Sequence, residues 1–182
     1  NKINSIIEEI DSMAEMMNDV LQLSRAKHSE IQLESLETKR TIEKICENAK
    51  ITFDSPKTEI IIMDCPKVLA DKTMMHQAFL NIINNAIKYS SQHENPRVEI
   101  EGTEEEDKVI YRISDNGIGI PEENKHKMFK IFNRMDNARK FKGNGVGLSI
   151  VHRIMKRIGG EVNYESSKDG TCFILTFKKP YL

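Results

Sequence analysis

The sequence predicts an α+β fold, a two-layer α/β sandwich with helices on one face of a sheet, preceded by a long N-terminal helix. Segments with helical spacing of apolar residues alternate with short β-rich segments. Two pairs of the β-rich segments are joined by short polar turns, which indicates antiparallel hairpins. The first 28 residues contain neither Pro nor Gly and carry a heptad pattern of apolar residues.

Residues 1–30 are predicted to form a dimerisation helix. No later segment repeats the heptad pattern, so we expect the apolar stripe to pack against a second copy of the chain and give a homodimer. Packing of this helix back onto the rest of the chain is the alternative. Residues 31–37 are predicted to be a linker. The stripe consists of Ile3, Ile6, Ile10, Met13, Met17 and Val20.

Residues 38–182 are predicted to form one domain. A mixture of helices with antiparallel hairpins is typical of a sandwich with its helices on one sheet face. The hairpin turns are the acidic residues 104–107 and the segment 168–170. We expect helices over residues 38–50, 72–89 and 145–158, and strands over residues 59–65, 97–103, 108–115, 161–166 and 171–178.

Bulk composition excludes several classes of protein. A net charge of -1 over 182 residues argues against a nucleic-acid partner. The apolar runs are too short to span a membrane, so we expect no membrane contact and a cytoplasmic domain. Cys46, Cys65 and Cys172 lack the spacing of metal ligands and are interpreted as reduced core thiols. The chain starts Asn-Lys-Ile, so we expect a piece of a longer protein, whose anchoring the sequence leaves open.

The predicted helix over residues 72–89 carries the first motif. Asn81, Asn84, Asn85 and Lys88 fall within one arc of about 100° on this helix. Asparagine is a poor helix former, so this cluster calls for a functional reason. Amide oxygens suit Mg²⁺, which also binds substrate phosphates, and Lys88 suits phosphate charge. Tyr89 is placed to pack beside a base or ribose. The alternative is a solvated polar face.

The second motif ends a predicted strand. Asp115 offers a carboxylate that accepts a hydrogen bond from an exocyclic amine. Gly117 and Gly119 let the backbone approach a flat ring closely. An ordinary turn that starts at an aspartate is the alternative.

The third motif, Gly143-x-Gly145-x-Gly147, opens an amphipathic helix and so predicts an anion site at the helix N-terminus. The motif lacks the lysine of a P-loop, and the polar, basic residues 135–142 replace the strand that a dinucleotide fingerprint needs. Residues 121–143 suit a lid over phosphates, and a solvated loop is the alternative. Its anchors are Phe129, Ile131 and Phe132, and its basic residues are Arg134, Arg139, Lys140 and Lys142.

In order and spacing these motifs resemble the catalytic and ATP-binding domain of sensor histidine kinases, within the GHKL ATPase family. Residues 81–89 resemble the N box, 115–119 the G1 box, 129–132 the F box and 143–148 the G2 box. Residues 68–71 and 170–173 resemble the segments that bracket the domain. The resemblance covers about residues 38–180 and implies the Bergerat type of ATP-binding fold. Residues 1–30 similarly resemble the second helix of a dimerisation domain.

The resemblance implies ATP as the ligand and Mg²⁺ as its cofactor. Asn85 is then the metal ligand, and Asn81 supports it one helical turn earlier. Asp115 reads the adenine amino group. The implied ATP-binding residues are Asn81, Asn85, Lys88, Tyr89, Asp115, Gly117, Gly119, Ile120, Phe132, Lys142, Gly143, Gly145, Val146, Gly147, Leu148 and Thr171.

The function implied by the resemblance is that of a protein-histidine kinase. Such an enzyme transfers the ATP γ-phosphate to a histidine of the dimerisation domain, for relay to an aspartate of a response-regulator receiver domain. The family's acceptor motif, a histidine followed by an acidic residue and then Arg and Pro, is absent around His28, His76, His93, His126 and His152. We therefore expect the acceptor upstream of residue 1 and no autophosphorylation by this chain alone. His28 is the rival acceptor by its location.

Two other functions stay open. Hydrolytic members of the family carry a glutamate where this chain has Asn81, and an amide does not act as a general base. The other alternative is an ATP-gated interaction module without catalysis. The G2 box commonly has Thr at the position of Asn144, a departure that we expect to be tolerated.

Overall fold

The computed structural model describes residues 17, 30–130, 136–138, 140, 141 and 143–181. These residues form a seven-stranded sheet. Six strands follow the order β1-β3-β7-β5-β4-β2, and the seventh, β6, also pairs with β7 and lies off this path. The strands are β1 (Glu34–Leu36), β2 (Glu59–Ile62), β3 (Val68–Ala70), β4 (Arg97–Glu104), β5 (Lys108–Asp115), β6 (Glu161–Ser167) and β7 (Gly170–Lys178).

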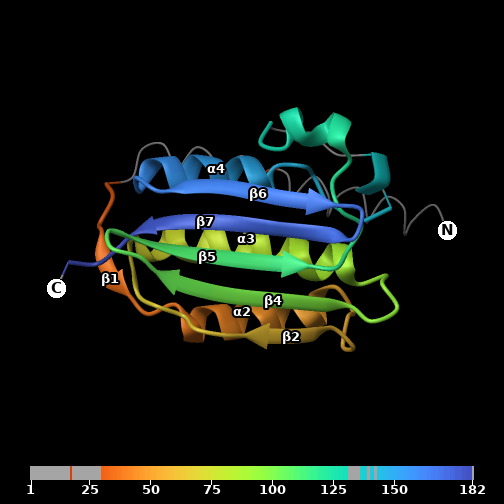
Figure 1. Ribbon diagram of the computed structural model, residues 1–182, viewed down its shortest axis with the longest axis horizontal. Coiled ribbons are helices and arrows are strands. Elements are labelled where there is room, and N and C mark those ends of the chain that lie inside the picture. The colour runs from red at the N-terminus through yellow and green to blue at the C-terminus, as the bar shows by residue number, and fades with distance from the viewer. Residues whose placement is uncertain (1–16, 18–29, 131–135, 139, 142, 182) are drawn as a thin grey trace.

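Three helices lie together on one face of this sheet (Figure 1). They are α2 (Lys39–Thr52), α3 (Lys72–Ser90) and α4 (Gly147–Arg157), with α3 packed between the other two. Two short 3₁₀ turns, η1 (Glu122–Lys127) and η2 (Asp136–Ala138), precede α4. The predicted two-layer α+β sandwich is confirmed, as are its three helices and both hairpins.

The core between the layers follows from strict alternation along the central strands. In β5, Val109, Tyr111 and Ile113 are fully buried, while the residues between them face away from the helices. Phe79 of α3 meets the Tyr111 ring edge to face at a centroid distance of 5.0 Å and stacks on Phe177 at 5.7 Å. Aromatic contacts of this kind fix how α3 sits on β5 and β7.

A buried polar group crosses this core. The Tyr111 hydroxyl donates to the Pro66 carbonyl at 2.7 Å and lies 2.6 Å from Thr38 Oγ1. Thr38 is the residue just before α2, so the hydroxyl network ties the start of α2 to the middle of the sheet. Because all three groups are paired, the burial of Tyr111 costs little in unmet hydrogen bonds.

Two strands were not predicted. The segment 31–37 was expected to be a linker, but Glu34–Leu36 pair antiparallel with Val68–Ala70. Both strands are only three residues long, too short to show the period-two alternation that identifies a strand. The pairing of β1 with β3, and of β3 with β7, supplies the order that the local sequence does not. The prediction of a linker is therefore wrong for β1.

The predicted dimerisation helix over residues 1–30 lies outside the described residues except for Met17 and Glu30. Within the described part of the chain, no helix has both the length and the apolar character that crossing a membrane requires.

Candidate nucleotide site

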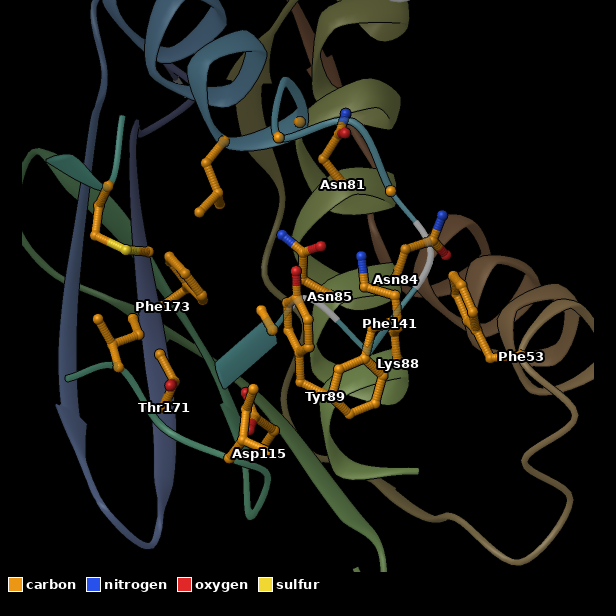
Figure 2. A pocket seen from close by; sticks show the side chains of 18 of the residues that line it. Phe53, Asn81, Asn84, Asn85, Lys88, Tyr89, Asp115, Phe141, Thr171 and Phe173 are labelled. Atoms are coloured by element: carbon orange, nitrogen blue, oxygen red, sulfur yellow. The ribbon is translucent and has the colours of Figure 1, made fainter. Parts of the chain in front are cut away.

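A cavity of about 490 Å³ opens between α3, the end of β5, the start of β7 and the loop that leads into α4 (Figure 2). All three sequence motifs contribute to it, although they are far apart in the chain. Residues 52 and 53, at the end of α2, form a further part of the wall. The cavity lies at one end of the helix layer, where the carboxyl end of β5 meets the last turns of α3.

The asparagines of α3 face this cavity, as the helical spacing predicts. Asn81 Nδ2 donates to the Gln77 carbonyl at 2.8 Å, which fixes the amide with its oxygen toward the glycine loop. Asn84 and Asn85 also line the wall, and within the described residues the Asn85 amide has no hydrogen-bond partner. One amide is thus held in place by the helix, and another is available to a ligand.

Asp115 lies at the other end of the cavity, beside Thr171 on the neighbouring strand β7. Its Oδ1 accepts a hydrogen bond from the Gly117 amide at 2.9 Å. Burial raises the pKa of the Asp115 carboxyl from 3.8 to about 7, although backbone hydrogen bonds from Gly117 and Thr171 oppose this rise. A carboxylate held away from water is a selective acceptor for a single amino group.

The residues after Asp115 hold the turn in place. Asn116 accepts from the Arg97 amide at 2.8 Å and donates to the Asn95 carbonyl at 2.7 Å. A Cβ at position 117 would lie 2.5 Å from the Tyr89 carbonyl, so Gly117 is needed for close packing against α3. Gly117 is not among the residues that line the cavity, and its contact with a flat ring stays a prediction.

Gly119 packs against the β6–β7 turn and also lines the cavity. Its φ is +62°, and a Cβ there would lie 1.8 Å from the Ser167 carbonyl. The next amide, of Ile120, donates to Ser166 Oγ at 2.9 Å, and that hydroxyl also lies 2.9 Å from Thr171 Oγ1. A hydroxyl pair thus joins the second motif to the edge of β7.

The glycine loop passes close to α3. Gly145 adopts a φ of +70°, and a Cβ at position 147 would lie 2.7 Å from Asn81 Oδ1. The residue that precedes α4, Val146, has no side chain to cap the helix. The first amides of α4 therefore start at the cavity without a side-chain partner, which favours an anion there.

Most of the predicted site residues come together in this cavity. Phe132 and Lys142 lie outside the described residues. The predicted residues that line the cavity are Asn81, Asn85, Lys88, Tyr89, Asp115, Gly119, Ile120, Gly143, Gly145, Val146, Gly147, Leu148 and Thr171.

Several lining residues were not predicted. Phe173 lies two positions after Thr171 on the same face of β7, so the strand period gave a usable signal for it. Phe141 is an apolar residue in a basic segment, which is a weaker signal. Thr52 and Phe53 belong to no motif, and only the tertiary fold brings them to the wall. The remaining unpredicted lining residues are Ile118, Met128 and Ala138, and Asn84 and Asn144 were noted without a role in ATP binding.

The donor set fits a nucleotide. The cavity has the Asp115 carboxylate at one end, and helix amides, amide side chains and the Lys88 ammonium toward the other. Among the described residues, histidine, cysteine and carboxylate side chains form no cluster of three that could hold a metal alone. A Mg²⁺ ion here would instead take oxygens from Asn85 and from phosphates, as this ion commonly does.

Comparison with known proteins agrees with this site. A family model described as histidine kinase-, DNA gyrase B-, and HSP90-like ATPase matches residues 70–181. The phytochrome-like protein Cph1 of Synechocystis is 28% identical over 172 residues, which cover 94% of this chain and 23% of Cph1. Sensor histidine kinase WalK of Bacillus subtilis is 32% identical over 181 residues, which cover 95% of this chain and 29% of WalK.

A solved structure shares the fold. The nucleotide-free catalytic domain of histidine kinase ThkA matches with a TM-score of 0.68 and 26% identity, over 81% of this chain and 98% of that domain. The chain spans less than a third of the length of Cph1 and WalK. The matched family model covers more than half of the chain and includes all three motifs of the cavity. The chain therefore belongs to the histidine kinase-, DNA gyrase B- and HSP90-like ATPase family, and its ATP-binding domain is of the sensor histidine kinase type.

Proposed function

We propose that this chain holds ATP with Mg²⁺ in the cavity and transfers the γ-phosphoryl group to a histidine that another segment supplies. The observation that carries the proposal is the chemistry of the cavity wall. Of the described lining residues, Asp115 alone carries a carboxylate, and it lies at the end suited to the base. The helix that faces the phosphate end, α3, contains no Asp or Glu. A site without a general base near the phosphates favours transfer over hydrolysis.

Each part of the wall has a role in this proposal. Asp115 accepts from the adenine amino group, and the amides at the start of α4 bind phosphate oxygens. Lys88 neutralises phosphate charge, and Asn85 ligates the metal, with Asn81 holding the glycine loop beside it. Mg²⁺ supplies further charge neutralisation, which phosphoryl transfer needs more than it needs covalent help.

The acceptor comes from outside the described residues. The histidines whose side chains the structure describes, His76, His93 and His152, do not line the cavity. In the transfer a bond forms between an imidazole nitrogen and the γ-phosphorus, the bond to the bridging oxygen breaks, and ADP leaves. An acceptor upstream of residue 1 fits this requirement, and His28 lies outside the described residues.

Nucleotide binding is tested first, by calorimetry with the 182-residue chain. We expect ATP to bind with Mg²⁺ and the affinity to fall sharply in EDTA. Asn85→Ala should abolish the Mg²⁺-dependent part of binding, whereas Asn48→Ala, on an exposed face of α2, should leave it unchanged. Equal affinity for wild type and Asn85→Ala would remove Asn85 from the metal role.

Transfer is tested with γ-labelled ATP and the longer protein that includes the upstream helix. We expect acid-labile, base-stable label on that protein and none on the 182-residue chain alone. Release of free phosphate without labelled protein would identify a hydrolase instead. Binding of ATP with neither product would identify an interaction module.

Three further parts of the proposal concern the setting of the domain. Residues 1–30 form a dimerisation helix ahead of the ATP-binding domain at 38–182, the domain works in the cytoplasm, and a response-regulator receiver domain takes the phosphoryl group. The heptad pattern and the resemblance to sensor histidine kinases support them. Sedimentation equilibrium of the chain tests the dimer, since a monomer at high concentration would contradict it.

A further inference from the structure

Phe141 is the apolar residue that joins the segment before the glycine loop to α3. Its side chain is 7% exposed although the neighbouring positions are basic. The Phe141 ring meets the Tyr89 ring edge to face, at a centroid distance of 5.2 Å and an interplanar angle of 87° (Figure 2). This geometry is the favourable one for an aromatic pair.

Tyr89 is in turn in contact with the Lys88 ammonium. Lys88 Nζ lies 4.5 Å from the centre of the Tyr89 ring, within cation–π range. The same ammonium approaches the glycine loop, because a Cβ at position 143 would lie 3.2 Å from Lys88 Nζ. Phe141, Tyr89, Lys88 and Gly143 thus form one continuous set of contacts between α3 and the start of the loop.

The residues just before Phe141 have a separate attachment. Asn137 Nδ2 donates to the Gly119 carbonyl at 3.3 Å, while Asn137 Oδ1 is buried without a hydrogen-bond partner. A polar contact that leaves its acceptor unmet is a weak anchor. The Phe141 amide donates to the Ala138 carbonyl at 3.1 Å, which links this turn to Phe141. The contact between the Phe141 and Tyr89 rings thus attaches the same segment to α3 at a further point.

Resting on the proposed function, we propose that Phe141 is a positioning residue for the nucleotide phosphates. Its contact with Tyr89 sets where the glycine loop starts relative to Lys88. The loop amides and the Lys88 ammonium bind phosphate oxygens rather than the base. Loss of the Phe141–Tyr89 contact therefore weakens the binding of a ligand that carries phosphates and has little effect on one that carries none. Phe141 touches none of the reacting atoms in this scheme and acts through Tyr89 and the loop.

The test compares ATP and adenosine as ligands for the 182-residue chain. Phe141→Leu keeps an apolar side chain and removes the aromatic pair, and we expect ATP affinity to fall about tenfold. Adenosine affinity should fall less than about twofold, since adenosine lacks the phosphates. Phe141→Tyr restores the ring and should bind ATP like wild type. In a double-mutant cycle, Tyr89→Leu and Phe141→Leu should be non-additive, because each removes the same contact.

Each outcome separates this inference from the function it rests on. Wild-type chain that fails to bind ATP would overturn the proposed function itself. ATP binding that is normal in wild type and unchanged in Phe141→Leu would overturn the inference alone. Equal losses for ATP and adenosine would assign Phe141 to the base pocket or to the fold, against the proposal. Tighter ATP binding by Phe141→Leu would show that the ring blocks the cavity, and would also refute it.

Discussion

If Asp115 accepts from the adenine amino group as proposed, the affinity of the cavity for adenine should depend on pH near neutrality. Its carboxyl has a pKa of about 7, so the free protein holds a mixture of protonated and ionised forms there. The adenine amino group is a donor and needs an acceptor, which the ionised form supplies best. We therefore expect adenine nucleotides to bind more tightly as the pH rises through 7.

The size of this effect follows from the pKa. At about pH 6 roughly one Asp115 side chain in eleven is ionised, and at about pH 8 roughly ten in eleven are. If only the ionised form binds the amino group, affinity rises about tenfold between these two pH values, which corresponds to about 1.4 kcal/mol of binding free energy. A loss of the carboxylate in Asp115→Asn should lower affinity by a similar factor at about pH 8, because a charge-assisted hydrogen bond becomes a neutral one.

Calorimetric titration of ATP into wild type and Asp115→Asn across this range measures the effect. Titration of the ATP phosphates is common to both proteins, so the ratio of their affinities isolates Asp115. The ratio should change about tenfold between pH 6 and pH 8, in favour of wild type at the higher pH. A ratio that stays constant across the range would refute the reasoning.

The folding stability of the nucleotide-free domain should decrease as the pH rises, which is opposite to the change in nucleotide affinity. The folded-state pKa of Asp115 is raised above 3.8, so the folded protein holds this proton more tightly than the unfolded chain. The resulting stabilisation is fully present below pH 3.8 and is lost as the pH rises through about 7. Urea unfolding at several pH values should show this loss in wild type and not in Asp115→Asn.

Two further substitutions test the frame around the cavity. Gly147→Ala places a Cβ 2.7 Å from Asn81 Oδ1, so the loop must shift. We expect ATP affinity to fall about tenfold in a fluorescence titration, while the circular dichroism spectrum stays unchanged. An affinity equal to that of wild type would show that the loop position is not critical. Tyr111→Phe removes the hydrogen bonds to Thr38 and Pro66. It should lower the free energy of unfolding, measured in urea, by about 1–3 kcal/mol without changing ATP affinity. A stability equal to that of wild type would show that the buried hydroxyl contributes nothing.

The parts of the site that the sequence predicts are those on a single regular element. Asn81, Asn85 and Lys88 share one side of a helix because the helical period brings them together, and the structure places all three on the cavity wall. Thr171 was assigned to the same site as Asp115 only through the resemblance. The strand register places them opposite each other across β5 and β7.

The parts that escaped prediction depend on packing between distant segments. Phe53 reaches the cavity because α2 ends beside α3, which no local pattern encodes. Gly117 was assigned to the ligand, and the structure adds a packing reason for this glycine, since a Cβ there would lie 2.5 Å from the Tyr89 carbonyl. A glycine pattern indicates a close approach to the backbone, and it does not distinguish a ligand from another part of the protein. The strands β1 and β3 were missed because three residues are too few to show a period.

The short strand β1 has few attachments to the sheet. Among the described strands it pairs only with β3, and β3 reaches β7 through the pair Leu69–Lys178, at the end of the sheet away from Asp115 (Figure 1). In native-state hydrogen exchange we expect β1 to belong to the least protected unit and β5, which carries Tyr111, to the most protected one. Thr38 marks the boundary between them through its bond to the Tyr111 hydroxyl. We therefore expect β1 to open at one end of the sheet before the opposite end, which carries Asp115, is affected.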